Sequence, residues 1–161
     1  MNNLIRSVVK DTSAETVLDV GCGTMVRLDK LPVKPDHYTG TDVSSKAIQI
    51  AQEKFPKATF FVADASSDAL PQADVVTAID VMPHIKKGHF YPVVSKLFRS
   101  ANKAVVIKTS LGVDDGFYQN AHDWGNGTIP NGWSRVDMGP PPDNSVARLW
   151  VFRKQEVGVA A

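Results

Sequence analysis

Apolar residues in this chain gather in short runs that alternate with amphipathic stretches. The runs have the pattern of strands buried on both faces, and they lie at residues 16–20, 37–42, 59–63, 74–79 and 104–109. Helical periodicity lies between them, at residues 44–55 and 90–100. Residues 25–31 allow only a brief helix, because Pro32 and Pro35 follow. Strands that alternate with helices predict a parallel sheet with right-handed crossovers.

The two ends of the chain depart from this alternation. Residues 4–9 have the pattern of a short amphipathic segment at the start of the chain, and residues 112–132 are rich in Gly, Asp and Asn. Residues 133–138 and 147–153 have the pattern of two strands joined by a proline-rich connector. We therefore expect an antiparallel hairpin to close the parallel sheet.

The helix at residues 44–55 carries its own start signal. Ser44 is the expected N-cap, because a serine hydroxyl accepts a hydrogen bond from the first helical turn. The apolar spacing predicts Ala47, Ile50 and Ala51 on the buried face.

Composition and charge limit the possible classes of function but do not identify one. A chain of 161 residues with 43% apolar residues suits one core, so we expect a single domain over residues 1–161. The net charge of +1 gives no global attraction to nucleic acid or to a membrane. Cys22 is the only cysteine and is expected to be structural, and no apolar run approaches the about 18 residues of a membrane span. A cytoplasmic protein is the expectation.

The most informative motif is the sequence VLDVGCGT at residues 17–24. An apolar strand followed by Gly21 and Gly23 predicts a sharp turn whose backbone approaches a ligand. Asp42 follows Gly23 by nineteen residues and suits the hydroxyls of an adenosine ribose. Val26 occupies the place of a third glycine, and the short helix disfavours a pyrophosphate.

Four acids lie at or near the carboxyl ends of the first four predicted strands: Asp19, Asp42, Asp64 and Asp80. Ligands of open α/β sheets bind at this edge. Converging acids favour a ligand that has a positive charge and ribose hydroxyls. S-adenosylmethionine has both.

The chain resembles class I S-adenosylmethionine-dependent methyltransferases from about residue 16 to 154. Four motifs carry the resemblance, in order, at residues 18–24, 41–44, 62–65 and 80–85. It implies a Rossmann-like methyltransferase fold of the α/β class. That fold has a seven-stranded, mostly parallel sheet with a C-terminal antiparallel hairpin and helices on both faces.

The resemblance also implies a set of cofactor contacts: Asp19, Gly21, Cys22, Gly23, Asp42, Val43, Asp64, Ala65 and Asp80. The glycine turn would present its backbone to the cofactor, with Asp19 near the amino group. Asp42 would accept hydrogen bonds from both ribose hydroxyls. Asp64 would meet the adenine amino group, while Ala65 offers its backbone and Val43 covers one adenine face.

Methyl transfer from a sulfonium requires positioning, and a base only if the acceptor loses a proton. Asp80 and His84 are the nearest candidates, although a surface role is the alternative for His84. Asp80 and Lys108 also resemble a pair in minimal RNA 2′-O-methyltransferases that activates a ribose hydroxyl. Arg148 stands where that pattern has an acid, and Lys10 is its only candidate for the N-terminal lysine. A solvent-exposed role is the alternative for Lys108.

Two further groups bear on the acceptor. Five basic residues follow one another without an acid: Lys86, Lys87, Lys96, Arg99 and Lys103. A solvated helix face is the favoured interpretation, and a polyanion-binding face is the alternative. Trp124 and Trp133 flank a Gly-Asn-rich loop and are expected to line an acceptor pocket, with packing as the alternative. The histidines lack ligand spacing, so no metal is predicted.

The sequence thus predicts a methyltransferase whose acceptor, a small molecule or RNA, is not specified. Few residues lie outside the scaffold, which suits a macromolecular acceptor, or a small one enclosed by residues 112–132 or by a second subunit. A homo-oligomer or a partner subunit is therefore expected as one way to complete the site. An RNA 2′-O-methyltransferase and a non-catalytic cofactor-binding subunit remain the alternatives.

Overall fold

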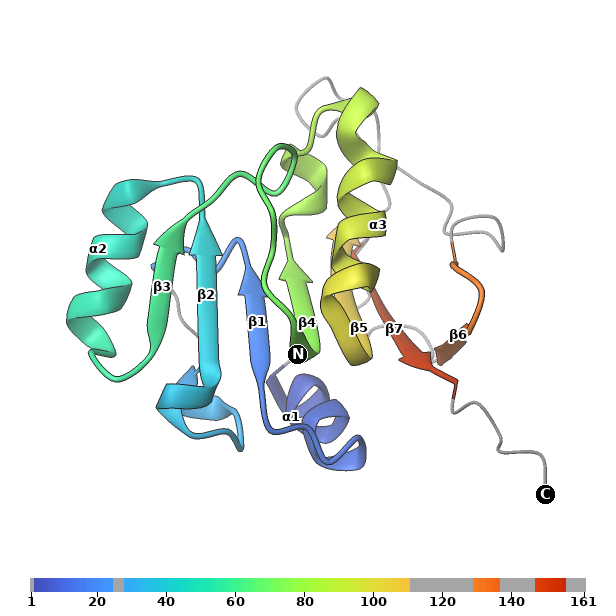
Figure 1. Cartoon of the computed structure of the whole chain (residues 1–161), viewed down its shortest axis with the longest axis horizontal. Coiled ribbons are helices and arrows are strands. Elements are labelled where there is room, and N and C mark those ends of the chain that lie inside the picture. Colours follow the sequence, from blue (N-terminus) through green and yellow to red (C-terminus); the bar gives the residue numbers. More distant parts are fainter. Residues whose placement is uncertain (1, 25–27, 111–128, 137–146, 156–161) are drawn as a thin grey trace.

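A computed structural model describes residues 2–24, 28–110, 129–136 and 147–155. They form one seven-stranded sheet with the order β3-β2-β1-β4-β5-β7-β6 (Figure 1). The strands are β1 (Val17–Val20), β2 (Tyr38–Asp42), β3 (Thr59–Val62), β4 (Ala73–Ile79), β5 (Ala101–Ser110), β6 (Trp133–Val136) and β7 (Ala147–Lys154). β1 to β5 are parallel, whereas β7 is antiparallel to both β5 and β6. The predicted methyltransferase-type sheet is confirmed.

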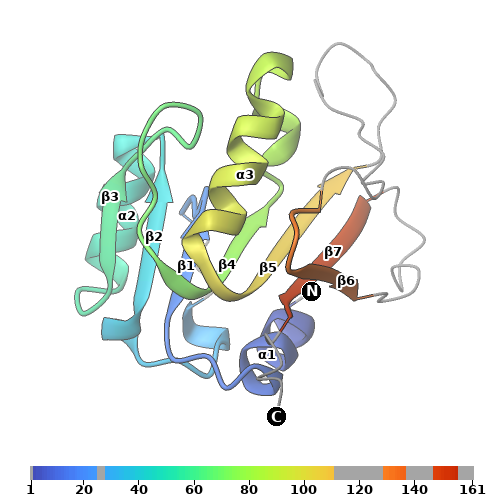
Figure 2. The same ribbon diagram turned by 45° about the vertical axis from the view of Figure 1, so that its right-hand side comes forward.

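Helices cover both faces of this sheet. The α-helices are α1 (Asn2–Asp11), α2 (Ser45–Lys54) and α3 (Phe90–Ser100). Short 3-10 helices complete the set: η1 (Leu28–Lys30), η2 (Pro35–His37), η3 (Met82–His84) and η4 (Lys87–His89). α3 lies across one face of β4 and β5, and α1 lies on the other side of the sheet (Figure 2).

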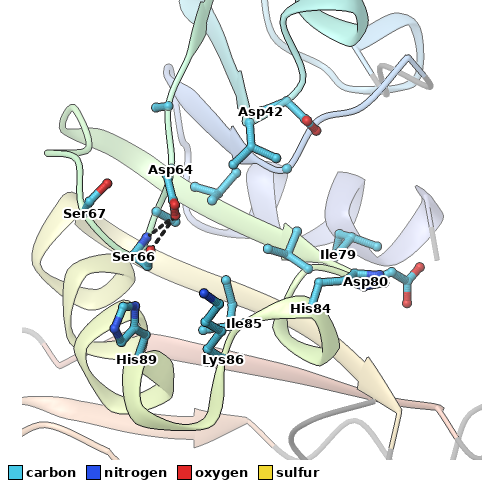
Figure 3. Close-up of a pocket in the computed structure, with 16 residues that line it drawn as sticks. Asp42, Asp64, Ser66, Ser67, Ile79, Asp80, His84, Ile85, Lys86 and His89 are labelled. Carbon is cyan, nitrogen blue, oxygen red and sulfur yellow. Dashed lines mark hydrogen bonds between the residues drawn. The ribbon is translucent and has the colours of Figure 1, made fainter. Parts of the chain in front are cut away.

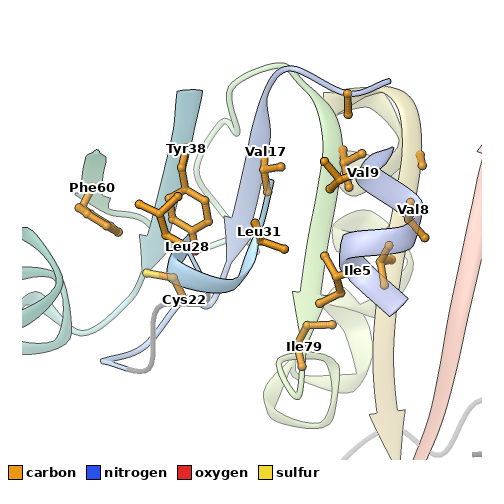
Figure 4. Close-up of a cluster of buried hydrophobic side chains, with 14 of the residues drawn as sticks. Ile5, Val8, Val9, Val17, Cys22, Leu28, Leu31, Tyr38, Phe60 and Ile79 are labelled. Carbon is orange, nitrogen blue, oxygen red and sulfur yellow. The ribbon is translucent and has the colours of Figure 1, made fainter. Parts of the chain in front are cut away.

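Two apolar cores result, one on each face of the sheet: the α1-side core and the α3-side core. On the first, Ile5, Val8 and Val9 of α1 are at most 2% exposed and pack in one cluster with residues of β1, β4 and β5 (Figure 4). On the second, Phe90 and Leu97 of α3 are fully buried against the opposite side of the same strands. Each such side chain contributes about 1.5–3 kcal/mol of burial free energy. Packing on both faces of the sheet therefore fixes the position of the strands and of their carboxyl ends.

The buried face of α2 differs from the prediction. Ser44 is the N-cap, as expected, and its hydroxyl accepts from the amide of Ala47 at 3.2 Å. Ile50 is 37% exposed, however, whereas Ile48 is only 4% exposed. The prediction for Ile50 was wrong because α2 rests on β2 and β3 through the side formed by Ala47, Ile48 and Ala51.

The segments around the sheet agree with the sequence where the structure describes them. The brief helix expected at residues 25–31 is represented by η1, since residues 25–27 lie outside the described part. β6 begins at Trp133 as predicted, and residues 137–138 lie outside the described part. Most of the loop at residues 112–132, Trp124 included, also lies outside it.

Candidate functional site

A cleft of about 610 Å³ opens at the carboxyl ends of β1 to β4 (Figure 3). This volume lies within the usual range of small-molecule sites. Its described lining is Val20, Gly21, Asp42, Val43, residues 63–67, Ile79, Asp80, Val81, His84, Ile85, Lys86 and His89. The cleft therefore gathers most of the residues that the sequence motifs indicated.

The glycine turn after β1 lines this cleft through Gly21, whereas Gly23 is not among the described lining residues. Gly21 and Gly23 have φ angles of +68° and +55°, which L residues with side chains rarely adopt. A Cβ atom on Gly21 would also overlap the Cγ2 atom of Val81. Glycine is therefore required at position 21 for two separate reasons, backbone conformation and close approach.

Asp42 joins the end of β2 to the glycine turn. Its Oδ2 accepts a hydrogen bond from the amide of Gly23, and its Oδ1 accepts one from the amide of Ser44, each at 2.9 Å. An ionised carboxylate has about four acceptor positions, so further donors from a ligand can be accommodated. Val43 follows on the cleft wall with 67% of its surface exposed, a large exposure for an apolar residue.

Asp64 starts the turn that follows β3. Its Oδ1 accepts from the amide of Ser66 at 2.8 Å and from the Ser66 hydroxyl at 2.6 Å (Figure 3). These two hydrogen bonds hold the pKa of the Asp64 carboxyl below its usual value. Burial raises that pKa, and the nearby charges of His89 and Lys96 lower it. The cleft therefore keeps a negative charge at this wall near neutral pH.

Asp80 and Lys108 meet at the end of β4. Nζ of Lys108 lies 2.8 Å from Oδ1 and 2.9 Å from Oδ2 of Asp80, and the Asp80 amide donates to the Lys108 carbonyl at 3.1 Å. Asp80 has a φ angle of +60°, so its backbone is in a conformation that costs energy for most residues. Lys108 is thus not a solvent lysine, and the expected juxtaposition of this pair is present. His84, on η3, lines the same cleft.

Asp19 and Cys22 lie beneath the turn, and neither is among the described residues that line the cleft. Asp19 is 1% exposed; its Oδ2 accepts from the Tyr38 hydroxyl at 2.6 Å and its Oδ1 from the Thr77 hydroxyl at 2.7 Å. The Cys22 side chain packs in the α1-side core, and its amide donates to the Thr41 carbonyl. Both side chains therefore support the turn, and a contact of either residue with the cofactor stays a prediction.

Comparison with known proteins decides the family. Residues 17–103, more than half of the chain, match the family model described as a methyltransferase domain. The chain belongs to the methyltransferase domain family. The predicted class I S-adenosylmethionine-dependent methyltransferase domain is therefore confirmed.

Individual relatives agree with this assignment. The chain is 29% identical over 102 residues to the magnesium-protoporphyrin O-methyltransferase of Rhodobacter capsulatus, covering 60% of this chain and 46% of the relative. It thus spans less than half the length of the curated relatives it matches.

Solved structures show the same fold. The N-methyltransferase NodS of Bradyrhizobium japonicum WM9 aligns with a TM-score of 0.73 at 15% identity, covering 96% of this chain and 93% of that one. The magnesium protoporphyrin IX methyltransferase of Synechocystis PCC 6803, which has S-adenosylhomocysteine bound, aligns with a TM-score of 0.68 at 17% identity, covering 96% and 82%.

The described side chains of the basic stretch at residues 86–103 have different roles in this methyltransferase domain. Nζ of Lys96 donates to the carbonyls of Ala65 and Asp68, and Nζ of Lys103 donates to the carbonyl of Ser13 and pairs with Asp74. Two of the five residues thus hold loops, whereas Lys86 lines the cleft. Among the described residues, Lys86, Lys96 and Lys103 therefore do not support the alternative of a continuous polyanion face.

Trp133 and Lys10 also lie away from the cleft. The Trp133 ring packs edge-on against Phe98 of α3, with the ring centroids 5.0 Å apart. Trp133 is not among the described residues that line the cleft, and its partly buried ring packs against the α3-side core, which was the alternative interpretation. Lys10 precedes Asp11, whose carboxylate pairs with Arg153 opposite the amino end of β5. Lys10 therefore lies at the amino ends of the parallel strands, whereas Asp80 lies at their carboxyl ends.

Sequence reasoning missed several residues of the cleft. Ser66 and Ser67 follow Asp64 directly, and the spacing Asp-x-Ser is itself the signal of a turn closed by a side-chain carboxylate. In the sequence, Lys86 stands out only as part of a basic stretch, and no motif indicates His89. Within the described residues, no group of acids, histidines or cysteines is arranged to hold a metal ion. None of the helices described there is long and apolar enough to cross a membrane.

Proposed function

We propose that this domain binds S-adenosylmethionine in the cleft and transfers the methyl group to an oxygen atom of an acceptor molecule. The observation that carries the proposal is the Asp42 carboxylate, fixed by the amides of Gly23 and Ser44 at the point where the glycine turn meets β2. A carboxylate held in this way is preorganised to accept two vicinal ribose hydroxyls.

The chemistry of the cleft fits that cofactor. Acids from three strand ends, Asp42, Asp64 and Asp80, complement a ligand with a positive charge. The exposed Val43 side chain offers an apolar surface to an adenine ring, and the adjacent Asp64 offers an acceptor to its amino group. Gly21 presents only backbone to the cleft, which suits the close approach of a ligand.

When bound, S-adenosylmethionine supplies an electrophilic methyl group on a sulfonium. The thioether that leaves requires no protonation. The chain contributes position and acceptor activation. Lys108 holds the Asp80 carboxylate beside the cleft. This carboxylate can take a proton from an acceptor hydroxyl. His84 lies on the same loop and is the second candidate for this proton.

An oxygen acceptor is favoured over other acceptors by two observations. The relative from Rhodobacter capsulatus is named as an O-methyltransferase acting on magnesium protoporphyrin. A hydroxyl is also the acceptor that benefits from a carboxylate base, since it must lose its proton. We therefore propose a small molecule with an ionisable oxygen as the acceptor.

RNA is the second candidate acceptor, and the Asp80–Lys108 pair favours it. The N-terminal lysine of that RNA-methyltransferase pattern is not beside the pair, because Lys10 lies at the amino ends of the strands. Methyl-labelled cofactor, incubated with the protein and a cell extract, separates the candidates. Label in a small-molecule fraction that is lost with Asp80→Asn supports the proposal, label in RNA supports the second candidate, and cofactor binding without any transfer supports a non-catalytic subunit.

A further inference from the structure

The turn that follows β3 is closed by its own hydrogen bonds. The amide of Asp64 donates to Oδ2 of Asp68 at 2.8 Å, and the amide of Asp68 donates to the Asp64 carbonyl at 2.7 Å. Ser66 donates twice to Oδ1 of Asp64. Residues 64–67 line the cleft, so this closed turn is one of its walls.

Lys96 holds the same turn from α3. It belongs to α3, is partly buried and is not among the described residues lining the cleft. Its Nζ donates to the carbonyl of Ala65 at 3.0 Å and to the carbonyl of Asp68 at 2.9 Å. Bonds from a charged donor are roughly twice as strong as neutral ones. One ammonium group therefore fixes both halves of the turn to a helix whose apolar face is buried in the core.

The carboxylate of Asp64 has one oxygen committed to the turn. Oδ1 accepts the two bonds from Ser66, whereas Oδ2 has no protein donor within the part of the chain that the structure describes. A carboxylate oxygen accepts hydrogen bonds and repels other acceptors. Its direction depends on the turn, because both Asp64 and its partner Ser66 lie within it.

We infer that Lys96 is a positioning residue that sets the purine specificity of the cleft, by holding the turn so that Asp64 favours a 6-amino purine over a 6-oxo purine. The inference rests on the proposed binding of an adenosine cofactor. An adenine amino group donates to the free oxygen, whereas a hypoxanthine base places an acceptor there. Loosening the turn lets the carboxylate move away, so the preference for adenine falls although the rest of the cleft is intact.

Calorimetry with two ligands tests this inference. S-adenosylhomocysteine and its hypoxanthine analogue, in which oxygen replaces the 6-amino group, are titrated into the wild type, Lys96→Met and Lys96→Arg. Leaving a charged acceptor unmatched weakens binding by about tenfold or more, which is the preference expected of the wild type. Lys96→Met should reduce the preference to about threefold or less, and Lys96→Arg, which retains charged donors, should restore most of it.

Controls separate the possible failures. Lys46→Met makes the same change at an exposed position of α2 and should keep the wild-type preference. Ser66→Ala removes a bond to Oδ1 of Asp64 and should lower the preference even if Lys96→Met does not fold. A wild type that binds neither ligand overturns the proposed function itself. A wild type that binds S-adenosylhomocysteine, together with a Lys96→Met protein that is folded and keeps the preference or loses both ligands equally, overturns the role of Lys96.

Discussion

The amide of Gly23 donates to Oδ2 of Asp42 at 2.9 Å, and this bond joins the two most informative motifs of the sequence into one unit. The glycine turn follows β1, and the acid ends the neighbouring strand β2. Because Oδ1 of Asp42 also accepts from Ser44, the carboxylate is held at both oxygens before any ligand arrives. Such preorganisation lowers the entropic penalty of binding.

Gly21→Ala should destabilise the domain by about 1–3 kcal/mol, because the new Cβ overlaps Val81 and the φ angle of +68° is unfavourable for alanine. Urea unfolding measures this loss. Gly88→Ala is the matched control, since nothing lies within 4 Å of a Cβ at that position. Adding Val81→Ala should recover only part of the loss, and an effect equal to that of Gly88→Ala would contradict the account of the turn.

Tyr38→Phe should reduce the free energy of unfolding by about 1–3 kcal/mol, since it leaves a buried carboxylate with one donor fewer. The bond in question runs from the Tyr38 hydroxyl to Asp19 at 2.6 Å, and both side chains are at most 1% exposed. A double-mutant cycle with Asp19→Asn isolates the pair. Strict additivity of the two changes would show that the pair is not coupled.

Asp80→Gly should retain or raise stability while methyl transfer falls by about tenfold or more, because glycine accepts the φ angle of +60° but has no carboxylate. Ser13 has a φ angle of +48° and lies far from the cleft, so Ser13→Gly is the control for relief of backbone strain alone. Transfer rates and unfolding are measured on both variants. If Asp80→Gly transfers methyl groups at the wild-type rate, Asp80 serves the turn and not the acceptor.

Asp74→Asn should lower stability by about 1 kcal/mol near pH 7, with a smaller effect in acid. Burial raises the pKa of Asp74, but the Glu15 amide and Lys103 outweigh it, and the net pKa lies below 3.8. A lowered carboxyl pKa stabilises the fold above the unfolded value and ceases to do so as the pH falls through the folded value. Urea titrations of both proteins at neutral pH and at a pH well below the lowered pKa of Asp74 check this, and an equal difference at both pH values would disagree.

Much of the fold follows from the sequence because buried parallel strands are continuous apolar runs. The Asp80–Lys108 contact was predictable for a related reason, since Ile79 pairs with Lys108 where two neighbouring strands end. Ser44 was found as an N-cap because capping depends on local chemistry alone. Patterns that act within a few residues, or along a strand, are thus readable without the structure.

The contacts of several other residues involve segments whose spatial arrangement cannot be read from the sequence. Asp19 turns to hydroxyls on β2 and β4, and only the sheet order places Tyr38 and Thr77 on either side of it. Lys96 looked like one of several surface charges, whereas its role arises from the passage of the 64–68 turn beside α3. Trp133 reached the core because β6 brings it against Phe98. These contacts are tertiary and leave no periodic signal.

The most direct test of the central claim is the affinity of the domain for S-adenosylhomocysteine measured by calorimetry on the wild type, Asp42→Ala and Asp36→Ala. Asp36 is exposed on η2 and is the control for loss of an aspartate. Asp42→Ala should weaken binding by about tenfold or more, which corresponds to about 1.4 kcal/mol, and Asp36→Ala should leave it unchanged. A 2′,3′-dideoxy analogue should lose the same affinity on the wild type but little on Asp42→Ala. Unchanged binding by a folded Asp42→Ala protein would contradict the account.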